Sequence, residues 1–209
     1  MKNLVIVGAG GFGREICSVA KTALGYGTEF TVKGFLDRKP DALDGKAGYP
    51  PVLGAPETYA IEPEDVFFVA LGNLRLRRKN ADLIASRGGT FLTLIHPSAS
   101  LGTNVTIGAG CYIAHNAVLT ADVTVGDNVC VFHGTVIGHD CRIGSCSHVS
   151  SLVFLGGGVQ VGEGVTIHPG VRVAPFKRIG DGATLGIGSV VLANVRERTT
   201  AFGNPALPV

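Results

Sequence analysis

Aliphatic residues recur at every sixth position along the second half of the chain. They are Leu101, Ile107, Ile113, Leu119, Val125, Val131, Ile137, Ile143, Val149, Leu155, Val161, Ile167, Val173, Ile179, Leu185 and Val191. The next residue is often glycine, and the residue four positions on is nearly always small or β-branched. This period is typical of a parallel β-helix, in which stacked coils bury one shared core. Three hexads per coil predict roughly five coils, on the order of 25 Å long.

The residues before Ile95 follow a different pattern. An apolar strand at 4–8 runs into glycines and an amphipathic helix, and further apolar segments lie at 32–37, 66–73 and 90–97, with a polar helical stretch at 74–88. This βαβ-type order predicts a small parallel sheet. We therefore expect an α/β plus β protein, with a Rossmann-like nucleotide-sugar-binding domain at 1–95 and a β-helix domain at 96–209.

Composition narrows the class of protein. Hydrophobic residues make up 45% of the 209 residues and charged residues 16%, with 31 glycines, which fits a turn-rich β protein. The net charge of +2 is spread along the chain, so we expect no nucleic-acid partner. The N-terminal apolar run is too short for a signal peptide or a membrane span, which predicts a cytoplasmic protein. The 5 cysteines form no CxxC pair, so no disulfide framework or thiolate zinc site is indicated.

A glycine-rich turn separates the first strand from the first helix. Gly8, Gly10 and Gly13 match the GxGxxG pattern, with Gly11 between them. Glycines let the backbone approach a ligand, and free N–H groups at a helix start attract a diphosphate. The region has room for about one mononucleotide half, and Asp37 lies further from the glycines than the roughly twenty residues typical of NAD sites. We favour a nucleotide sugar over NAD, and a purely structural turn stays open.

A second candidate substrate contact follows the strand at 66–73. Gly72 and Asn73 end that strand, at the edge where open α/β sheets bind ligands. Arg77 lies one helical turn later, within reach of a phosphate.

Several short motifs occur in a specific order along the whole chain. They are VGAGGFG at 7–13, FLD at 35–37, ALGN at 70–73, LIHPSA at 94–99, GHDCRIG at 138–144, SHVS at 147–150 and GNPA at 203–206. The chain thereby resembles the bacterial hexapeptide-repeat sugar acetyltransferases, which include sialic-acid O-acetyltransferase and the N-acetyltransferases of nucleotide-linked 4-amino sugars. The resemblance implies a left-handed β-helix, a homotrimer and a role in polysaccharide biosynthesis.

The resemblance also implies catalytic roles. His139, at an outward position of its hexad, matches the general base that takes a proton from the attacking amine or hydroxyl, and Asp140 orients it. His148, half a coil away, matches a residue that lies against the thioester of acetyl-CoA, so a site between subunits is expected. Direct transfer needs neither a metal nor a covalent intermediate.

Glycines and basic residues of the later coils match the family's acetyl-CoA site. Gly157, Gly186 and Gly188 match its glycine turns, the GNPA tail closes over the cofactor, and Lys177 and Arg178, with Arg172 and Arg196, suit the CoA phosphates. Lys177 replaces a small residue of the repeat, so either the coil opens there or the amine reaches out to solvent.

We predict transfer of acetyl to the amino group of a nucleotide-linked 4-amino-4,6-dideoxy sugar. O-acetylation of a sialic acid is the main alternative. Three further alternatives are covalent catalysis by Cys141 or Cys146, an NAD oxidoreductase and a nucleotide-sugar sensor. His115 and His133 should stack on adjacent coils, which leaves open zinc held by histidines between subunits.

Overall fold

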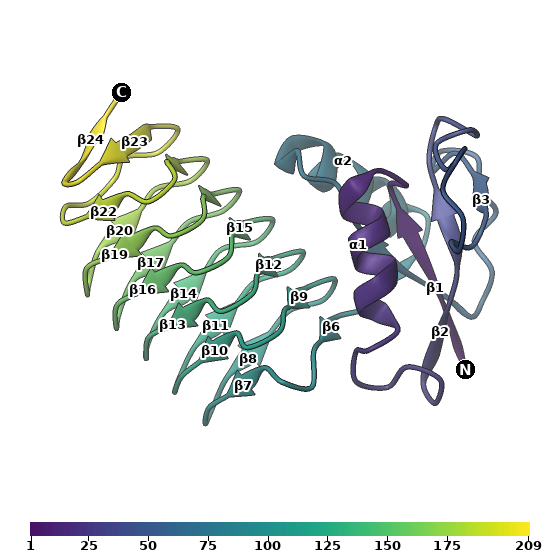
Figure 1. The fold of residues 1–209 in the computed structure, drawn as a ribbon, viewed down its shortest axis with the longest axis horizontal. Helices are drawn as coiled ribbons and strands as arrows, with labels where there is room; N and C mark the ends of the chain where they lie inside the picture. The colour runs from purple at the N-terminus through teal and green to yellow at the C-terminus, as the bar shows by residue number, and fades with distance from the viewer. The chain divides into compact units, whose positions relative to one another are not determined.

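The computed structural model describes residues 1–209 and divides them into two units, Met1–Pro97 and Ser98–Val209 (Figure 1). None of the helices has the length and apolar character that a membrane span requires. The two units are built on different principles and are described separately.

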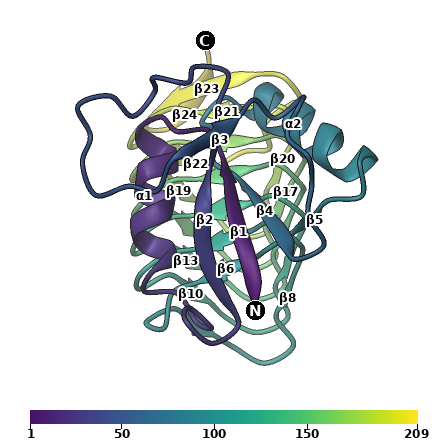
Figure 2. The same cartoon turned by 90° about the vertical axis from the view of Figure 1, so that its right-hand side faces the viewer.

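The first unit is a parallel sheet with two helices. The strands lie in the order β3-β2-β1-β4-β5, and Figure 2 shows β2, β1 and β4 side by side. Their bounds are Lys2–Val7 (β1), Phe30–Leu36 (β2), Val52–Gly54 (β3), Asp65–Val69 (β4) and Thr90–Phe91 (β5), with helices Gly11–Ala20 (α1) and Leu74–Ser86 (α2), and β6 at Leu94–Ile95. The parallel sheet predicted from the apolar segments is present.

Burial explains why these segments form strands. From Leu4 to Val7, β1 is buried, as is the whole of β4. Central strands of a parallel sheet are covered on both faces, so they read as continuous apolar runs. The short strand β3 was not predicted, because its three residues are only half-buried and lie among glycines and prolines.

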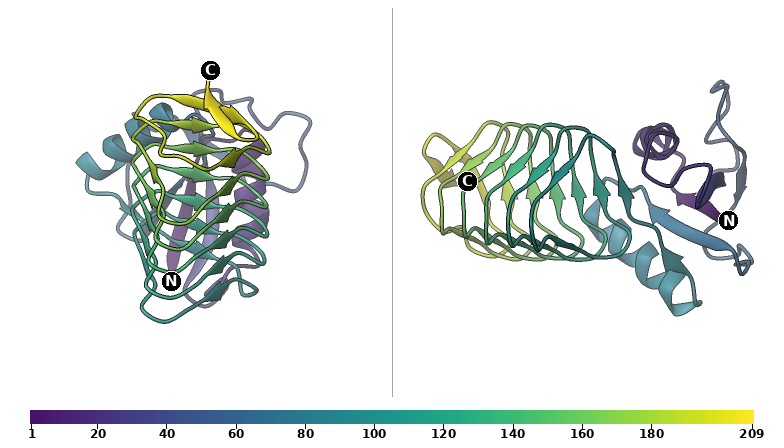
Figure 3. Two further views of the ribbon diagram at one scale, coloured as in Figure 1. Left: turned by 90° about the vertical axis from the view of Figure 1, so that its left-hand side faces the viewer. Right: turned by 90° about the horizontal axis from the view of Figure 1, so that it is seen from below.

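The second unit is a parallel β-helix with three faces, and Figure 3 shows its coils stacked one on the next. Face I contains Ser100–Leu101 (β7), Val118–Leu119 (β10), Val136–Ile137 (β13), Phe154–Leu155 (β16), Arg172–Val173 (β19) and Val190–Val191 (β22). Face II contains Thr106–Ile107 (β8), Thr124–Val125 (β11), Arg142–Ile143 (β14), Gln160–Val161 (β17) and Arg178–Ile179 (β20). Face III contains Tyr112–Ile113 (β9), Cys130–Val131 (β12), His148–Val149 (β15), Thr166–Ile167 (β18), Thr184–Leu185 (β21), Thr200–Gly203 (β23) and Ala206–Pro208 (β24).

The hexad aliphatics form the core of this unit. Leu119, Ile137 and Leu155 are fully buried and pair in register on face I. The turn positions recur with the same period and have left-handed backbone conformation. They include Asn104, Gly110, Asn116, Asp122, Asn128, Gly134, Asp140, Gly158, Gly164, Gly170, Gly182 and Gly188. Glycine, asparagine and aspartate adopt this conformation at low cost, so the turn residues and the aliphatics specify the same coil.

Candidate active site

His139 and Asp140 form a close pair on the turn between faces I and II. The distance from His139 Nδ1 to Asp140 Oδ2 is 2.7 Å, and the two side chains are 62% and 65% exposed. Asp140 occupies a left-handed turn position, which directs its side chain beside the preceding residue. Because the carboxylate engages Nδ1, Nε2 is the ring nitrogen left to exchange a proton with a ligand.

Gly157 supports the His139 ring from the next coil. A Cβ at Gly157 would overlap the ring, close to Nε2. Gly157 is not among the left-handed residues, so the requirement for glycine here is space. The His139 carbonyl also accepts the Gly158 N–H at 2.7 Å. The predicted cofactor glycine is thus part of the platform on which the predicted base rests.

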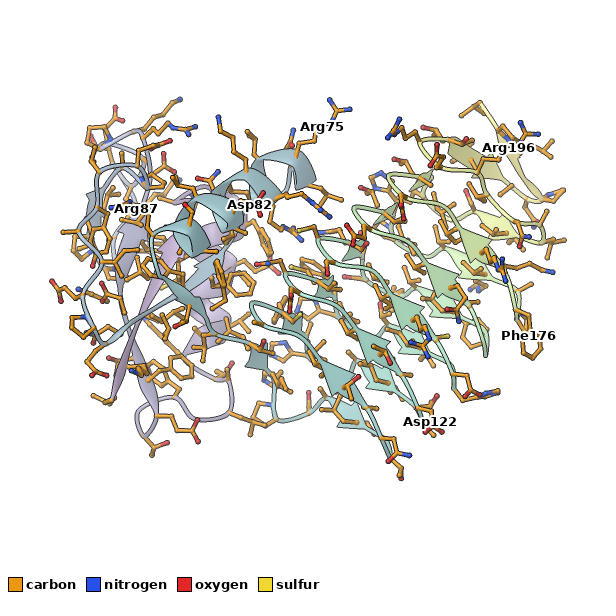
Figure 4. All side chains as sticks on the ribbon, turned by 180° about the vertical axis from the view of Figure 1, so that it is seen from behind. Arg75, Asp82, Arg87, Asp122, Phe176 and Arg196 are labelled. Carbon is orange, nitrogen blue, oxygen red and sulfur yellow. The ribbon has the colours of Figure 1, made fainter.

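The same turn continues along the β-helix as an exposed edge. Asp122 and Phe176, labelled in Figure 4, protrude from this edge one coil before Asp140 and two coils after it. The Phe176 ring is 74% exposed and covers the position that a Gly158 side chain would take. An apolar ring therefore stands on the same edge as the His139–Asp140 pair.

His148 lies on a different part of the coil. It begins β15 on face III, half-buried, with its ring centroid 4.7 Å from that of Phe132. The structure therefore brings Asp140 to His139 within one chain but does not bring His148 to them.

His115 and His133 stack as predicted, with ring centroids 5.2 Å apart and an interplanar angle of 26°. No group of three or more His, Cys, Asp or Glu side chains is placed to hold a metal ion.

The predicted cofactor residues occupy two edges. Gly186 and Gly188 lie on the turn between faces III and I, and the Phe202 ring fills the space beside Gly186 while Gly188 is open. Lys177 and Arg178 lie at the start of face II, with Lys177 half-buried and Arg178 exposed. The Gln160 N–H still donates to the Lys177 carbonyl at 2.9 Å, so the coil stays closed at Lys177. The GNPA tail is the turn of the β23–β24 hairpin.

The cysteines are poorly placed as nucleophiles. Cys141 is fully buried, its thiol lies 3.2 Å from the Gly156 carbonyl oxygen, and burial raises its pKa. Cys146 is also buried. A covalent mechanism needs an accessible thiolate, and neither side chain supplies one.

In the first unit, the glycine turn has the features of an anion site. Gly8 has φ +103°, and a Cβ on Gly13 would overlap the Gly8 carbonyl, so α1 packs directly on the end of β1. Gly10 caps α1 without a side-chain hydrogen bond, and nothing lies within 4 Å of a Cβ at Gly10 or Gly11. Asp37 Oδ2 accepts the Ala9 N–H at 2.9 Å, which ties the end of β2 to this turn.

Two predicted substrate residues have structural contacts. Asn73 caps α2 by accepting the Leu76 N–H, and Gly72 beside it is open. Arg77 is only 1% exposed, donates from Nε to the Leu71 carbonyl at 2.9 Å and lies over the Phe12 ring. The guanidinium is thus held by the protein at the base of α2, and a phosphate contact from Arg77 stays a prediction.

A cavity of about 110 Å³ lies at the carboxyl ends of β1 and β2 and beside α2. Its lining residues are Val7, Gly8, Leu36, Asp37, Arg38, Pro56, Leu71, Leu76 and Asn80. The sequence predicted Gly8 and Asp37 but not Pro56, Leu76 or Asn80. The rule that ligands bind at the carboxyl edge of a parallel sheet indicates the region but not these residues.

Comparison with known proteins shows the family to which the chain belongs. Residues 3–84 match the family described as the PglD N-terminal domain, and residues 92–196 belong to the family described as the GMPPB C-terminal domain. The solved acetyltransferase domain of PglB from Neisseria gonorrhoeae, in complex with acetyl coenzyme A, is 31% identical with a TM-score of 0.89, and the match covers 100% of this chain and 99% of that one. The chain belongs to the family of nucleotide-linked amino-sugar N-acetyltransferases.

Two further relatives represent this family. PerB from Caulobacter crescentus, solved with CoA and GDP-perosamine, is 31% identical with a TM-score of 0.88, covering 100% of this chain and 98% of that one. A curated relative, UDP-N-acetylbacillosamine N-acetyltransferase of Bacillus subtilis, is 33% identical over 115 residues, and the match spans only 51% of its length. The predicted family is confirmed, and with it the fold class of a parallel-sheet unit followed by a left-handed β-helix.

Proposed function

We propose that this protein transfers the acetyl group of acetyl-CoA to the amino group of a nucleotide-linked sugar of the 4-amino-4,6-dideoxy type. The observation that carries the proposal is the exposed His139–Asp140 pair, in which the carboxylate engages Nδ1 and leaves Nε2 to accept a proton. The acetyl coenzyme A bound to PglB and the CoA and GDP-perosamine bound to PerB support the same chemistry.

His139 acts as the general base in the proposed reaction. The neutral sugar amine attacks the thioester carbon, and Nε2 takes the proton that the nitrogen loses. The carbonyl oxygen becomes an oxyanion, the C–S bond then breaks, and CoA leaves as a thiolate. Asp140 stabilises the imidazolium formed at His139 through its contact with Nδ1.

The proposed donor site needs two copies of the chain. His139 and Gly157 lie on the edge between faces I and II, whereas His148 is on face III and Gly186 and Gly188 on the edge between faces III and I. Face I lies between these edges and directs apolar side chains outward, among them Val118, Val136, Phe154 and Val190, of which Phe154 is 46% exposed. We propose a homotrimer. In it, the edge between faces I and II of one subunit lies against face III, with His148, and the edge between faces III and I of the neighbouring subunit.

The nucleotide part of the substrate is assigned to the first unit. The diphosphate is placed at Gly10 and Gly11, at the start of α1, and the ribose at Asp37, beside Gly8. Lys177 and Arg178, in the second unit, are proposed to contact the CoA phosphates. A cytoplasmic location stays a prediction from the sequence.

The test follows thiol release from acetyl-CoA with a panel of acceptors. The panel contains UDP-, dTDP- and GDP-linked 4-amino-4,6-dideoxy sugars and free sialic acid. Turnover on a nucleotide-linked amine is the expected result. Turnover on sialic acid alone would replace the proposal with O-acetylation, and no thiol release with any acceptor would contradict both.

A further inference from the structure

The cavity beside α2 has the size and walls of a site for one planar ring. Its volume is about 110 Å³, and its walls are apolar at Val7, Leu36, Pro56, Leu71 and Leu76. For scale, an engineered apolar cavity of about 150 Å³ binds benzene. Leu76 is 44% exposed although it is a large aliphatic residue, so it offers an apolar surface at the cavity mouth.

Asn80 places one polar group among these apolar walls. It is 4% exposed, and its Nδ2 donates to the Leu76 carbonyl at 2.8 Å, one turn earlier in α2. This bond fixes the amide and leaves Oδ1 as the acceptor that Asn80 can offer to a ligand in the cavity it lines. A ligand N–H that donates to this oxygen would stabilise the complex through one further hydrogen bond.

The other polar groups of the cavity connect it to the glycine turn. Asp37 and Gly8 both line it, and Asp37 bonds the Ala9 N–H of that turn. The Arg38 guanidinium pairs with Glu57 at the surface. A nucleotide with its diphosphate at the start of α1 and its ribose at Asp37 therefore has the cavity within reach of its base.

We propose that this cavity binds the nucleobase and that Asn80 Oδ1 accepts the N3–H of uracil or thymine. The inference rests on the proposed function and specifies the nucleotide. Family membership leaves the nucleotide open, because one relative is named for a UDP sugar and another was solved with a GDP sugar. Cytosine has an acceptor at N3, which would face the Asn80 oxygen, and guanine has two rings for a one-ring space.

The experiment is calorimetric titration of the full chain with UDP, dTDP, CDP and GDP. UDP or dTDP should bind at least about 10-fold more tightly than CDP, because a site built to hydrogen-bond a ligand N–H rejects a ligand that lacks it. They should also bind more tightly than GDP, because the two rings of guanine exceed the one-ring space. Equal or tighter binding of GDP would overturn the base assignment and leave the proposed function intact. Failure of all four to bind would contradict the nucleotide site itself.

Asn80→Ala tests the residue. The affinity for UDP should fall about 10-fold while that for CDP stays unchanged, because only UDP offers the N3–H. Equal weakening of UDP and CDP would show that Asn80 merely supports the fold and would overturn its assignment. Asp82→Ala, at an exposed position of the same helix, is the control and should bind UDP as the wild type does.

Discussion

At the scale of single residues, the proposed base His139 needs the carboxylate of Asp140 to stabilise its protonated form. His139→Ala should lower kcat by about 100-fold or more, because the amine then has no base on the protein. Asp140→Asn should lower kcat by about 10-fold, since asparagine tolerates the left-handed turn but lacks the negative charge that stabilises imidazolium. Steady-state thiol release measures both, and circular dichroism checks the fold. Near-normal turnover of His139→Ala would remove it as the base.

Gly157 is expected to act only through the position of the His139 ring. Gly157→Ala should lower kcat by about 10-fold or more, because the added methyl would overlap the ring and displace Nε2. Its melting temperature should change little, since the ring can move into solvent. In a double-mutant cycle, adding Gly157→Ala to His139→Ala should cost nothing further. An additional loss would show that Gly157 contacts acetyl-CoA independently of His139.

At the scale of elements, a charge network around the buried Asp65 joins β2 to β4. Lys33 Nζ donates to Asp65 Oδ1 at 2.9 Å, to Tyr59 Oη at 2.8 Å and to Glu62, and Tyr59 donates to Asp65. Burial acts to raise the pKa of Asp65, but the Glu62 N–H, Lys33 and Tyr59 outweigh it and hold the pKa below its ordinary value. Desolvation acts to lower the pKa of Lys33, but its hydrogen bonds to Glu62, Tyr59 and Asp65 outweigh this effect and raise the pKa above its ordinary value.

Lys33→Met should therefore destabilise the protein by about 3 kcal/mol at pH 7, because it leaves the Asp65 carboxylate buried without its cation. A carboxyl whose pKa is lower in the folded state stabilises above the ordinary value of 3.8, and this contribution is lost as pH falls through the folded pKa. Denaturant unfolding at several pH values should show the gap between wild type and variant narrowing below pH 4. The exposed Lys2–Glu64 pair supplies the control, since Lys2→Met should cause no measurable loss.

The coils of the β-helix could be predicted from the sequence, whereas the burial of residues in α2 could not. The coils were predictable because each hexad combines a buried aliphatic residue with a turn residue that tolerates left-handed backbone conformation, as at Ile137 and Asp140. Both features recur with the same period of six. Asn80 was not predictable, because it lies in a helix whose sequence is polar and reads as solvated. Its burial comes from packing of α2 beside β4, which no local pattern encodes. The burial of Arg77 was not predictable either, because a charged residue in a polar helix is usually exposed.

At the scale of the whole molecule, the distribution of site residues over two edges predicts catalysis between subunits. His139→Ala and His148→Ala should each be poorly active, because every site of a homotrimer then lacks one histidine. Mixed trimers of the two variants should regain activity, since some sites receive His139 from one chain and His148 from the other. Co-expression with two affinity tags isolates such mixed trimers, and thiol release compares them with each parent variant.

Light scattering and thermal unfolding check that loss of activity does not come from loss of the trimer or of the fold. The wild type should have the mass of three chains in solution, and each single variant should retain that mass and its melting temperature. If the mixed trimers are no more active than the parent variants, the shared site is contradicted. Either both histidines then act within one chain, or His148 takes no part in catalysis. A wild type that is active as a monomer would contradict the shared site directly. Recovery of activity would instead explain why the two histidines lie on separate faces of the β-helix: each coil presents half of the site to one neighbour and half to the other.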